Sequence, residues 1–212
     1  MKKSKICGTK ILCIAALGII LAMLTSCTSM LVSDSNNPKL AWQEFSQYIS
    51  QGNFTAAFDM TQNGSVSVDP EDDSEYAELL MKAISDSYTY EFVSDTDVFG
   101  VTAWQNIAIT SLDMRVLAEN AVSGAVKDAE AYAYKNGSYE TDEEIAAAVN
   151  VKMTELLTSP SDCLSTTVVR VEFSYSDGKW LPVMSDKLYE VISGYSSQAD
   201  ETIADYLKRN NS

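Results

Sequence analysis

Histidine is absent from all 212 residues of the sequence, and cysteine and proline occur only four times each. Without histidine the chain lacks the commonest general base and the residue that activates most serine and cysteine nucleophiles. It also lacks the commonest side-chain ligand for transition metals. Much of the usual catalytic repertoire is therefore excluded, and we expect a protein that is not an enzyme and that needs no cofactor.

Basic residues are scarce as well, with 15 Lys and Arg against 30 Asp and Glu. Four of the lysines lie within the first ten residues, whereas every acidic residue follows Cys27. Beyond that cysteine, 11 basic residues therefore stand against 30 acidic ones. A chain of this charge repels polyanions. We expect no nucleic-acid partner and no electrostatic attraction to anionic lipid head groups.

The N-terminal region has the order of a signal peptide. Lys2, Lys3, Lys5 and Lys10 form a positive segment, and residues 11–24 form an uninterrupted apolar run. These 14 residues would rise only about 21 Å as a helix, less than the roughly 30 Å hydrocarbon core of a bilayer. The order and the short run predict a signal peptide over residues 1–26.

The apolar run ends in Leu24-Thr25-Ser26-Cys27, an aliphatic residue followed by two small residues and a cysteine. This order resembles the lipobox of bacterial lipoproteins. The resemblance implies cleavage before Cys27, attachment of diacylglycerol to the Cys27 thiol, and often a further acyl chain, such as palmitate, on the new N-terminus. Two or three acyl chains anchor a protein stably, because one chain binds a bilayer only reversibly. We therefore expect the membrane as a partner through Cys27, with the protein on the outer, extracytoplasmic face of the cell membrane.

An uncleaved transmembrane anchor is the alternative interpretation of this region. No charged residue occurs between Lys10 and Asp34, which leaves 23 uncharged residues. The polar residues around Cys27 disfavour a span. Both interpretations place the rest of the chain outside the cytoplasm, because the lysine-rich segment stays inside.

Cys163 is the last cysteine of the chain, and after processing at Cys27 it would have no partner for an internal disulfide. It also lacks a histidine or a second cysteine in a CxxC motif that would activate its thiol. We interpret it as a small residue at the entrance of a strand, without a chemical role.

Helical periodicity predicts three opening helices in a domain that follows a short polar tether. We expect the lipidated tether at residues 27–37 and a single α+β domain over residues 38–212. Each helix begins at a capping residue and carries apolar residues on one face. The helices are expected from Asn37 to Gly52, from Asn53 to Phe58, and from Asp69 to Ile84.

The pattern then alternates between strands and helices. Strands are expected over residues 88–92 and 101–110, with a turn at residues 95–100. Caps at Asp113 and Thr141 predict a pair of long helices that form a helical hairpin. Alternation over residues 169–184 around Asp177-Gly178 predicts a β-hairpin, in which Pro182 indicates an edge strand or a bulge. Ser185 caps a closing helix.

These elements predict the α+β class, with N-terminal helices packed on a curved antiparallel sheet and an inserted helical hairpin. Three segments, AWQEFSQYISQGNFTAAFDM, IAITSLDMRVL and VVRVEFSYSDGKWLPV, resemble the nuclear-transport-factor-two-like (cystatin-like) cone fold. The likeness is to domains of unknown function in exported lipoproteins of Gram-positive bacteria. The helical hairpin over residues 114–157 departs from a minimal cone, and such an insertion is able to cover or fill the pocket of the fold.

Enzymes of this fold class that resemble ketosteroid isomerase use an aspartate or histidine base with tyrosines inside the cone. By this resemblance Tyr88, Tyr90 and Asp113 are candidate ligand-binding residues. Asp113 is also expected to cap a helix, and the two tyrosines are expected to be core aromatics with a polar tip. The resemblance to the fold does not by itself carry the function.

The acidic residues Asp69, Glu71, Asp72 and Asp73 are candidate oxygen ligands for a hard cation such as calcium. The segment lacks the glycine turn and the ligand spacing of an EF-hand loop. The helix macrodipole already favours acidic residues in a first helical turn. We therefore predict no metal site.

Two functions are open. The first is a non-enzymatic, membrane-anchored lipoprotein whose domain binds a small ligand, a peptide or a neighbouring envelope protein; it predicts a pocket or patch without converging titratable groups. The second is a cone-fold enzyme of lyase or isomerase type; it predicts a buried carboxylate with a raised pKa in a closed pocket. We favour the first.

Overall fold

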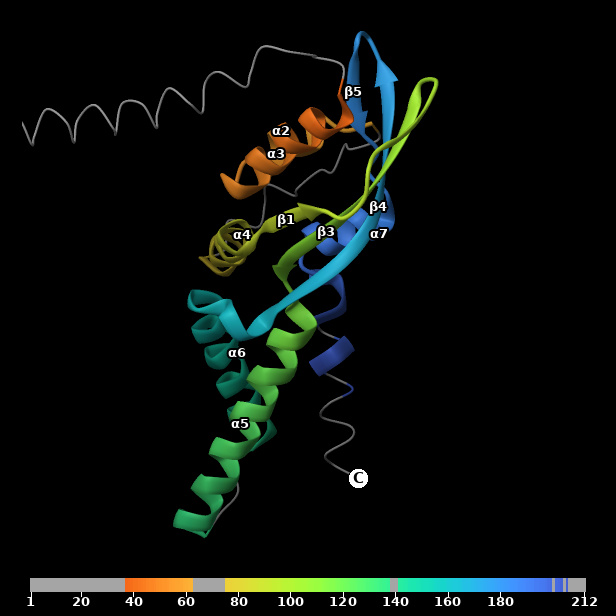
Figure 1. Ribbon diagram of the computed structural model, residues 1–212. Helices are drawn as coiled ribbons and strands as arrows, with labels where there is room; N and C mark the ends of the chain where they lie inside the picture. The colour runs from red at the N-terminus through yellow and green to blue at the C-terminus, as the bar shows by residue number, and fades with distance from the viewer. Residues whose placement is uncertain (1–36, 63–74, 138–140, 200, 204, 206–212) are drawn as a thin grey trace, which may run out of the picture. The chain divides into compact units, whose positions relative to one another are not determined.

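The computed structural model describes residues 37–62, 75–137, 141–199, 201–203 and 205. In this part of the chain, helices lie against a curved antiparallel sheet, and a pair of long helices is inserted between two strands (Figure 1). The predicted α+β fold class is therefore confirmed. The predicted signal peptide at residues 1–26, the lipidation site Cys27 and residues 28–36 of the tether lie outside the described residues.

The opening helices begin where the capping residues predict. Helix α2 (Pro38–Ser50) starts after Asn37, whose side chain accepts a hydrogen bond from the Lys39 backbone N–H at 2.9 Å. Helix α3 (Phe54–Asp59) starts after Asn53, which accepts from the backbone N–H of Ala56. Helix α4 is described over Glu75–Ser87, and the start expected for it at Asp69 lies outside the described residues.

The sheet has the strand order β1-β3-β4-β5, and the short strand β2 also pairs with β3. All described pairings between these strands are antiparallel. Strand β5 lies at one edge, which confirms the edge position expected for Pro182. The strands are β1 (Thr89–Phe92), β2 (Asp97–Phe99), β3 (Thr102–Leu112), β4 (Leu164–Ser176) and β5 (Lys179–Pro182).

Strand β2 corrects the prediction of a plain turn over residues 95–100. Its three residues pair with the first three of β3, and the chain reverses only at Gly100 and Val101. All three side chains are exposed. An edge strand with no buried face shows no alternation of apolar and polar residues, so the sequence carried no signal for it.

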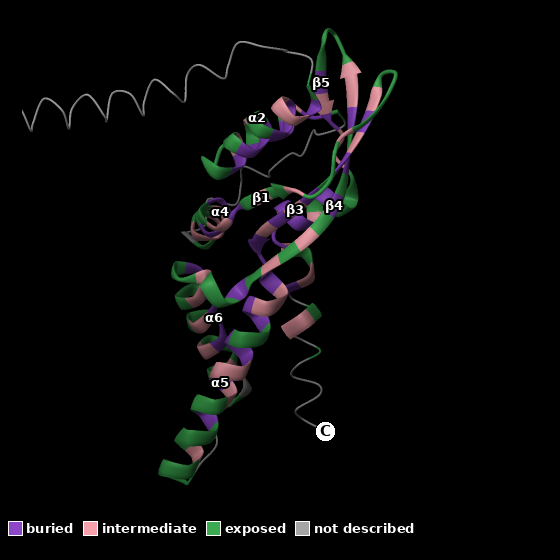
Figure 2. Ribbon diagram, viewed as in Figure 1, coloured by how far each residue is buried: buried purple, intermediate pink, exposed green. Residues whose placement is uncertain are grey.

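The hydrophobic core lies on one face of β3 and β4. Ile107 pairs with Val169 in register, and both side chains are buried. Helices α2 and α7 (Asp186–Ile192) contribute apolar side chains to the same core. Figure 2 shows the buried segments following these strands and the inner faces of the helices. The large fully buried side chains include Trp42, Phe45, Ile49, Ile107, Ile109, Phe173, Leu188 and Ile192.

The inserted hairpin consists of α5 (Met114–Asn136) and α6 (Asp142–Thr158), followed by the short 3-10 helix η1 (Pro160–Cys163). Thr141 and Glu144 form the predicted capping box at the start of α6. Gly137 ends α5 in the left-handed conformation at φ 71°. Small residues of α5 face larger apolar residues of α6, so the helices pack closely; the buried residues are Ala118, Ala121, Val122, Ala125, Val149, Met153 and Leu157.

The segment after α7 is fastened to the junction between β3 and α5. Gly194 has φ +66°, and its backbone carbonyl accepts a hydrogen bond from the Met114 N–H at 2.8 Å. A Cβ atom at Gly194 would lie 2.9 Å from the Leu112 carbonyl oxygen. Ser111 Oγ donates to the Val191 carbonyl at 2.8 Å. Glycine is therefore required at position 194, because both the φ angle and the close approach exclude a side chain.

Candidate functional site

An open groove of about 410 Å³ lies between α2 and the beginning of β1. Helix α2 supplies side chains at the spacing i, i+3, i+4 and i+7, which share one helix face. The opposite wall comes from Tyr88 and the first two residues of β1. The lining carries amide, hydroxyl and phenol groups and no charged side chain; it consists of Gln43, Ser46, Gln47, Ser50, Tyr88, Thr89 and Tyr90.

Side-chain contacts spaced about one helical turn apart along α2 hold this helix against β1. Toward the end of α2, Ser46 Oγ lies 3.1 Å from the Tyr88 hydroxyl, both being buried. The ring of Trp42, one turn earlier, meets Tyr90 edge-on with centroids 6.0 Å apart. At the start of α2, Lys39 Nζ lies 5.3 Å from the centroid of Phe92. The groove walls are thus fixed by the packing of the core beneath them.

The two tyrosines of the groove keep their protons at neutral pH. Burial raises the pKa of Tyr88 far above its ordinary value, and the hydrogen bond with Ser46 offsets only a part of that shift. Burial also raises the pKa of Tyr90, which is half-buried at the rim. Neither phenol is suited to act as a base, but Tyr90 offers a ring face and a hydroxyl to a bound molecule.

A second open groove, of about 450 Å³, lies between the end of α2 and α4. Ser50 lines both grooves. On the α4 side the wall carries charged groups, among them the exposed pair of Lys82 and Asp86 with Nζ 2.5 Å from Oδ2. The two grooves together offer an elongated surface along α2.

Asp113, the third residue nominated from the sequence, belongs to a different set of contacts. Its carboxylate lies at the start of α5, where Oδ1 accepts from the Arg115 backbone N–H at 3.1 Å and from Arg115 Nε at 2.9 Å. Oδ2 accepts from Arg115 Nη2 at 2.7 Å. The structure therefore brings Tyr88 and Tyr90 together, with ring centroids 6.5 Å apart, while Asp113 caps a helix and forms an ion pair.

The electrostatics of Asp113 are those of a charged, paired carboxylate. Burial raises its pKa, but the hydrogen bonds and the positive charge of Arg115 outweigh burial, so the pKa lies below its ordinary value. A buried general base needs the opposite shift, toward neutral pH. Asp113 thus lacks the raised pKa that a cone-fold lyase or isomerase would require of it.

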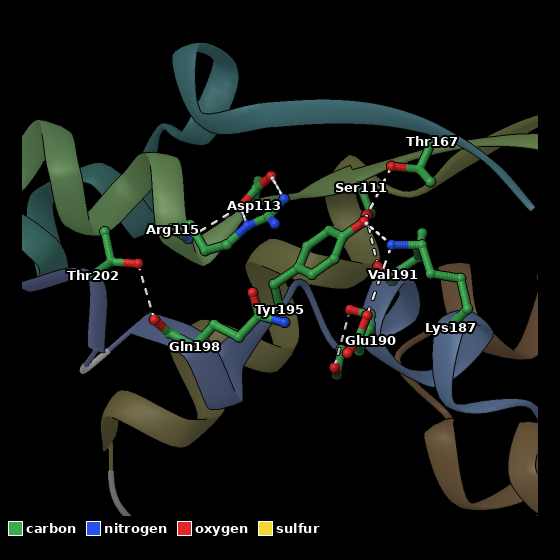
Figure 3. A network of polar contacts seen from close by, with 11 residues as sticks. Ser111, Asp113, Arg115, Thr167, Lys187, Glu190, Val191, Tyr195, Gln198 and Thr202 are labelled. Atoms are coloured by element: carbon green, nitrogen blue, oxygen red, sulfur yellow. Dashed lines mark hydrogen bonds and ion pairs between the residues drawn. The ribbon is translucent and has the colours of Figure 1, made fainter.

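Arg115 continues the contact network toward the C-terminal segment, as Figure 3 shows. Its guanidinium carbon lies 3.7 Å from the ring centroid of Tyr195. The Tyr195 hydroxyl lies 3.2 Å from both Lys187 Nζ and Thr167 Oγ1. Lys187 also pairs with Glu190 at 3.7 Å. These contacts link α5, β4 and α7 around one aromatic ring.

Tyr195 itself is buried and has φ 55°, a left-handed conformation that is uncommon for a residue with a side chain. Such a conformation persists only when its surroundings over-determine it. The two cations at its ring and hydroxyl provide those surroundings. The network therefore serves to fasten the segment after α7 to the start of α5.

Cys163 lies immediately before β4 and its side chain is fully buried. Burial raises the pKa of its thiol, although Asn120 Nδ2 approaches the sulfur at 3.6 Å as a donor. Its backbone carbonyl accepts a hydrogen bond from the Asp113 N–H at 2.7 Å. The interpretation as a small residue at a strand entrance is confirmed.

The metal candidates Asp69, Glu71, Asp72 and Asp73 lie outside the described residues. Among the residues that the structure does describe, no group of three or more Cys, Asp or Glu is placed to hold a metal ion. In the same part of the chain, no helix is both long enough and apolar enough to cross a membrane.

Neither the protein-family models nor the curated proteins contain a match to this chain. Among solved structures, the chain is similar to a "putative lipoprotein (ycdA)" from Bacillus subtilis subsp. subtilis str. 168, with 18% sequence identity and a TM-score of 0.35. The match covers 72% of this chain and 45% of that protein, so the chain spans less than half of its length. This similarity is too weak to support a conclusion about function.

Proposed function

We propose that the chain is a lipid-anchored, extracytoplasmic binding protein of a bacterial envelope. The observation that carries the proposal is the order of the first 27 residues: lysines, an apolar run of 14 residues, and Leu24-Thr25-Ser26-Cys27. Acyl chains on Cys27 hold the protein at the outer face of the cell membrane. The curved sheet and its opening helices belong, in this proposal, to the nuclear-transport-factor-two-like cone fold.

The binding surface is the groove between α2 and β1, together with its continuation past Ser50. Strand β1 is an edge of the sheet, and an edge strand offers unpaired backbone N–H and C=O groups to an extended segment. Gln43 and Gln47 face it with side-chain amides that donate and accept hydrogen bonds. The groove therefore suits an extended peptide segment of a neighbouring envelope protein.

A binding role accounts for the described side chains better than an enzymatic one. The groove between α2 and β1 is lined by uncharged groups, and its tyrosines have raised pKa values. Asp113 is held as a carboxylate by Arg115 and contributes nothing to that groove. Among the groups that line it, none combines a general base with an acid at hydrogen-bond distance, as acid–base catalysis requires.

Metabolic labelling with an alkyne fatty acid tests the anchor. We expect the wild-type chain and the Cys163→Ala variant to incorporate the label and to partition into detergent, and the Cys27→Ala variant to lose both properties. Cys163→Ala is the matched control, because it also removes one thiol from the chain. Label that survives in Cys27→Ala, or no label in the wild type, would refute the lipoprotein assignment.

Site-specific photo-crosslinking in cells tests the groove. A photoreactive residue at Gln47, on the groove wall, is expected to give one discrete adduct, which mass spectrometry then assigns to an extended peptide segment. The same residue at Glu130, which is exposed on α5, is expected to give none. Equal adducts at both positions, or none at Gln47, would remove the groove as the binding surface.

A further inference from the structure

The turn between β2 and β3 exposes three large apolar side chains. Val98 is 55% exposed, Phe99 79% and Val101 62%. Residues 98–102 contain no charged side chain. The turn glycine, Gly100, has φ +60° and borders open space, since an added Cβ there would meet nothing within 4 Å. Figure 2 shows this turn as an exposed end of the sheet. Clustered exposed apolar groups mark a surface that contacts something less polar than water.

The chain enters the domain at the same end of the sheet as this turn. Helix α2 begins beside Phe92, the last residue of β1, and ends near Tyr88, which precedes β1. The first turn of α2 therefore lies toward β2, because β1 runs on into that strand. Figure 1 shows the start of α2 beside β5 at this end. The point of entry, Asn37, and the apolar turn thus share one end of the domain.

The distances along the chain place this turn within reach of an anchored membrane. From Ile107, the partner of Phe92, to Thr102 at the turn is about 17 Å along β3. The ten residue steps from Cys27 to Asn37 span at most about 36 Å. An acyl chain on Cys27 therefore keeps the entry point close enough for the turn to touch the bilayer.

We infer that Val98, Phe99 and Val101 form a membrane-contacting turn that inserts into the interfacial layer of the bilayer beside the lipid anchor. The inference rests on the proposed anchor at Cys27. The contact is apolar and not electrostatic, since Asp97 precedes the turn and the chain is acidic. These charges confine insertion to the uncharged tip. The anchor keeps the domain near the membrane, and the inserted turn orients the domain relative to the bilayer.

Fluorescence of a labelled full-length chain tests the contact. Phe99→Cys is labelled with the environment-sensitive dye NBD and reconstituted in phosphatidylcholine vesicles, whose zwitterionic lipids remove any contribution of net charge. We expect the fully buried Cys163 not to react with the dye. Tyr134→Cys is the control, because it is 95% exposed on α5, which starts at the opposite end of β3. Mass spectrometry of the N-terminal peptide first establishes acylation.

We expect lipids with a nitroxide near the head group to quench the label at position 99 at least about twofold more than the label at position 134. Iodide in the water should show the reverse order. Val101→Cys repeats the measurement if Phe99→Cys fails to give a native circular dichroism spectrum.

Each other outcome overturns the inference. An acylated chain whose label at position 99 is as open to iodide as the label at position 134 leaves the anchor intact but removes the membrane contact. An unacylated chain removes both the anchor and the contact. Self-quenching at position 99 that grows with the protein-to-lipid ratio assigns the turn to a second copy of the chain.

Discussion

Substitution of Asp113 separates its two roles at the start of α5. Asp113→Ala removes both the helix cap and the ion pair with Arg115, whereas Asp113→Asn keeps a side chain that caps equally well. Loss of a cap costs about 1 kcal/mol, and loss of hydrogen bonds to a charged group costs about 1.5–3 kcal/mol. The Arg115 side chain is 40% exposed, so water solvates its charge once the carboxylate is lost. The cost of losing its hydrogen bonds therefore lies at the low end of that range, about 1.5 kcal/mol. We expect a loss of about 2.5 kcal/mol of unfolding free energy for Asp113→Ala and about 1.5 kcal/mol for Asp113→Asn.

Urea unfolding followed by the fluorescence of the buried Trp42 and Trp180 measures both values. The midpoints should move at an unchanged dependence of free energy on urea concentration. Because the folded-state pKa of Asp113 lies below its ordinary value of about 3.9, the charge contributes stability above that pH. This contribution is lost as the pH falls through the lowered pKa, so the gap between wild type and Asp113→Asn should close in acid. The reasoning fails if both variants lose the same stability, or if the gap is constant from neutral to acidic pH.

Three further predictions concern buried groups. Gly194→Ala should cost at least about 1 kcal/mol in the same urea assay, because its Cβ meets the Leu112 carbonyl at a positive φ; a neutral result would contradict the close approach. Tyr88→Phe should cost about 1 kcal/mol and leave alkaline phenolate formation below pH 12 unchanged, since burial raises the pKa of Tyr88; a smaller phenolate signal in spectrophotometric titration would show that Tyr88 titrates normally. The Cys163 thiol should resist maleimide in native protein and react in urea, as mass spectrometry would detect, and native labelling would contradict its burial.

The sequence predicted the features that depend on neighbouring residues. Caps at Asn37, Asn53, Thr141 and Ser185 marked the starts of four helices, because each side chain bonds to a backbone N–H within three residues. The turn at residues 177–178 and the alternation that precedes it identified the last β-hairpin. These signals are local, so a single sequence is enough to read them.

The contacts that hold the segment after α7 to the start of α5 join residues far apart in the sequence. No local sequence pattern predicts them. Arg115 stacks on Tyr195, a residue 80 positions away, and their proximity exists only after β3, α5 and α7 have packed. Asp113 and Arg115 are two residues apart, a spacing that points to different faces of a helix. They pair because Asp113 is the extended cap residue and not yet part of the helix.

The candidate groove was predictable only in part. The tyrosines were found because they alternate in a strand, and α2 was found because of its apolar stripe. The polar stripe of Gln43, Ser46, Gln47 and Ser50 reads in the sequence as an ordinary solvent-facing surface. Only the packing of α2 along β1 turns that surface into a wall of a groove.

The inserted helical hairpin also bears on how fast the sheet assembles. Strands β3 and β4 form the longest ladder, yet about fifty residues separate Leu112 from its partner Leu164. Closing a flexible loop of that length would slow folding. Helices α5 and α6 pack against each other, and once they do, they bring the two strand ends together at η1. The effective loop then shrinks to a few residues, and the longest ladder can close like a hairpin from that end.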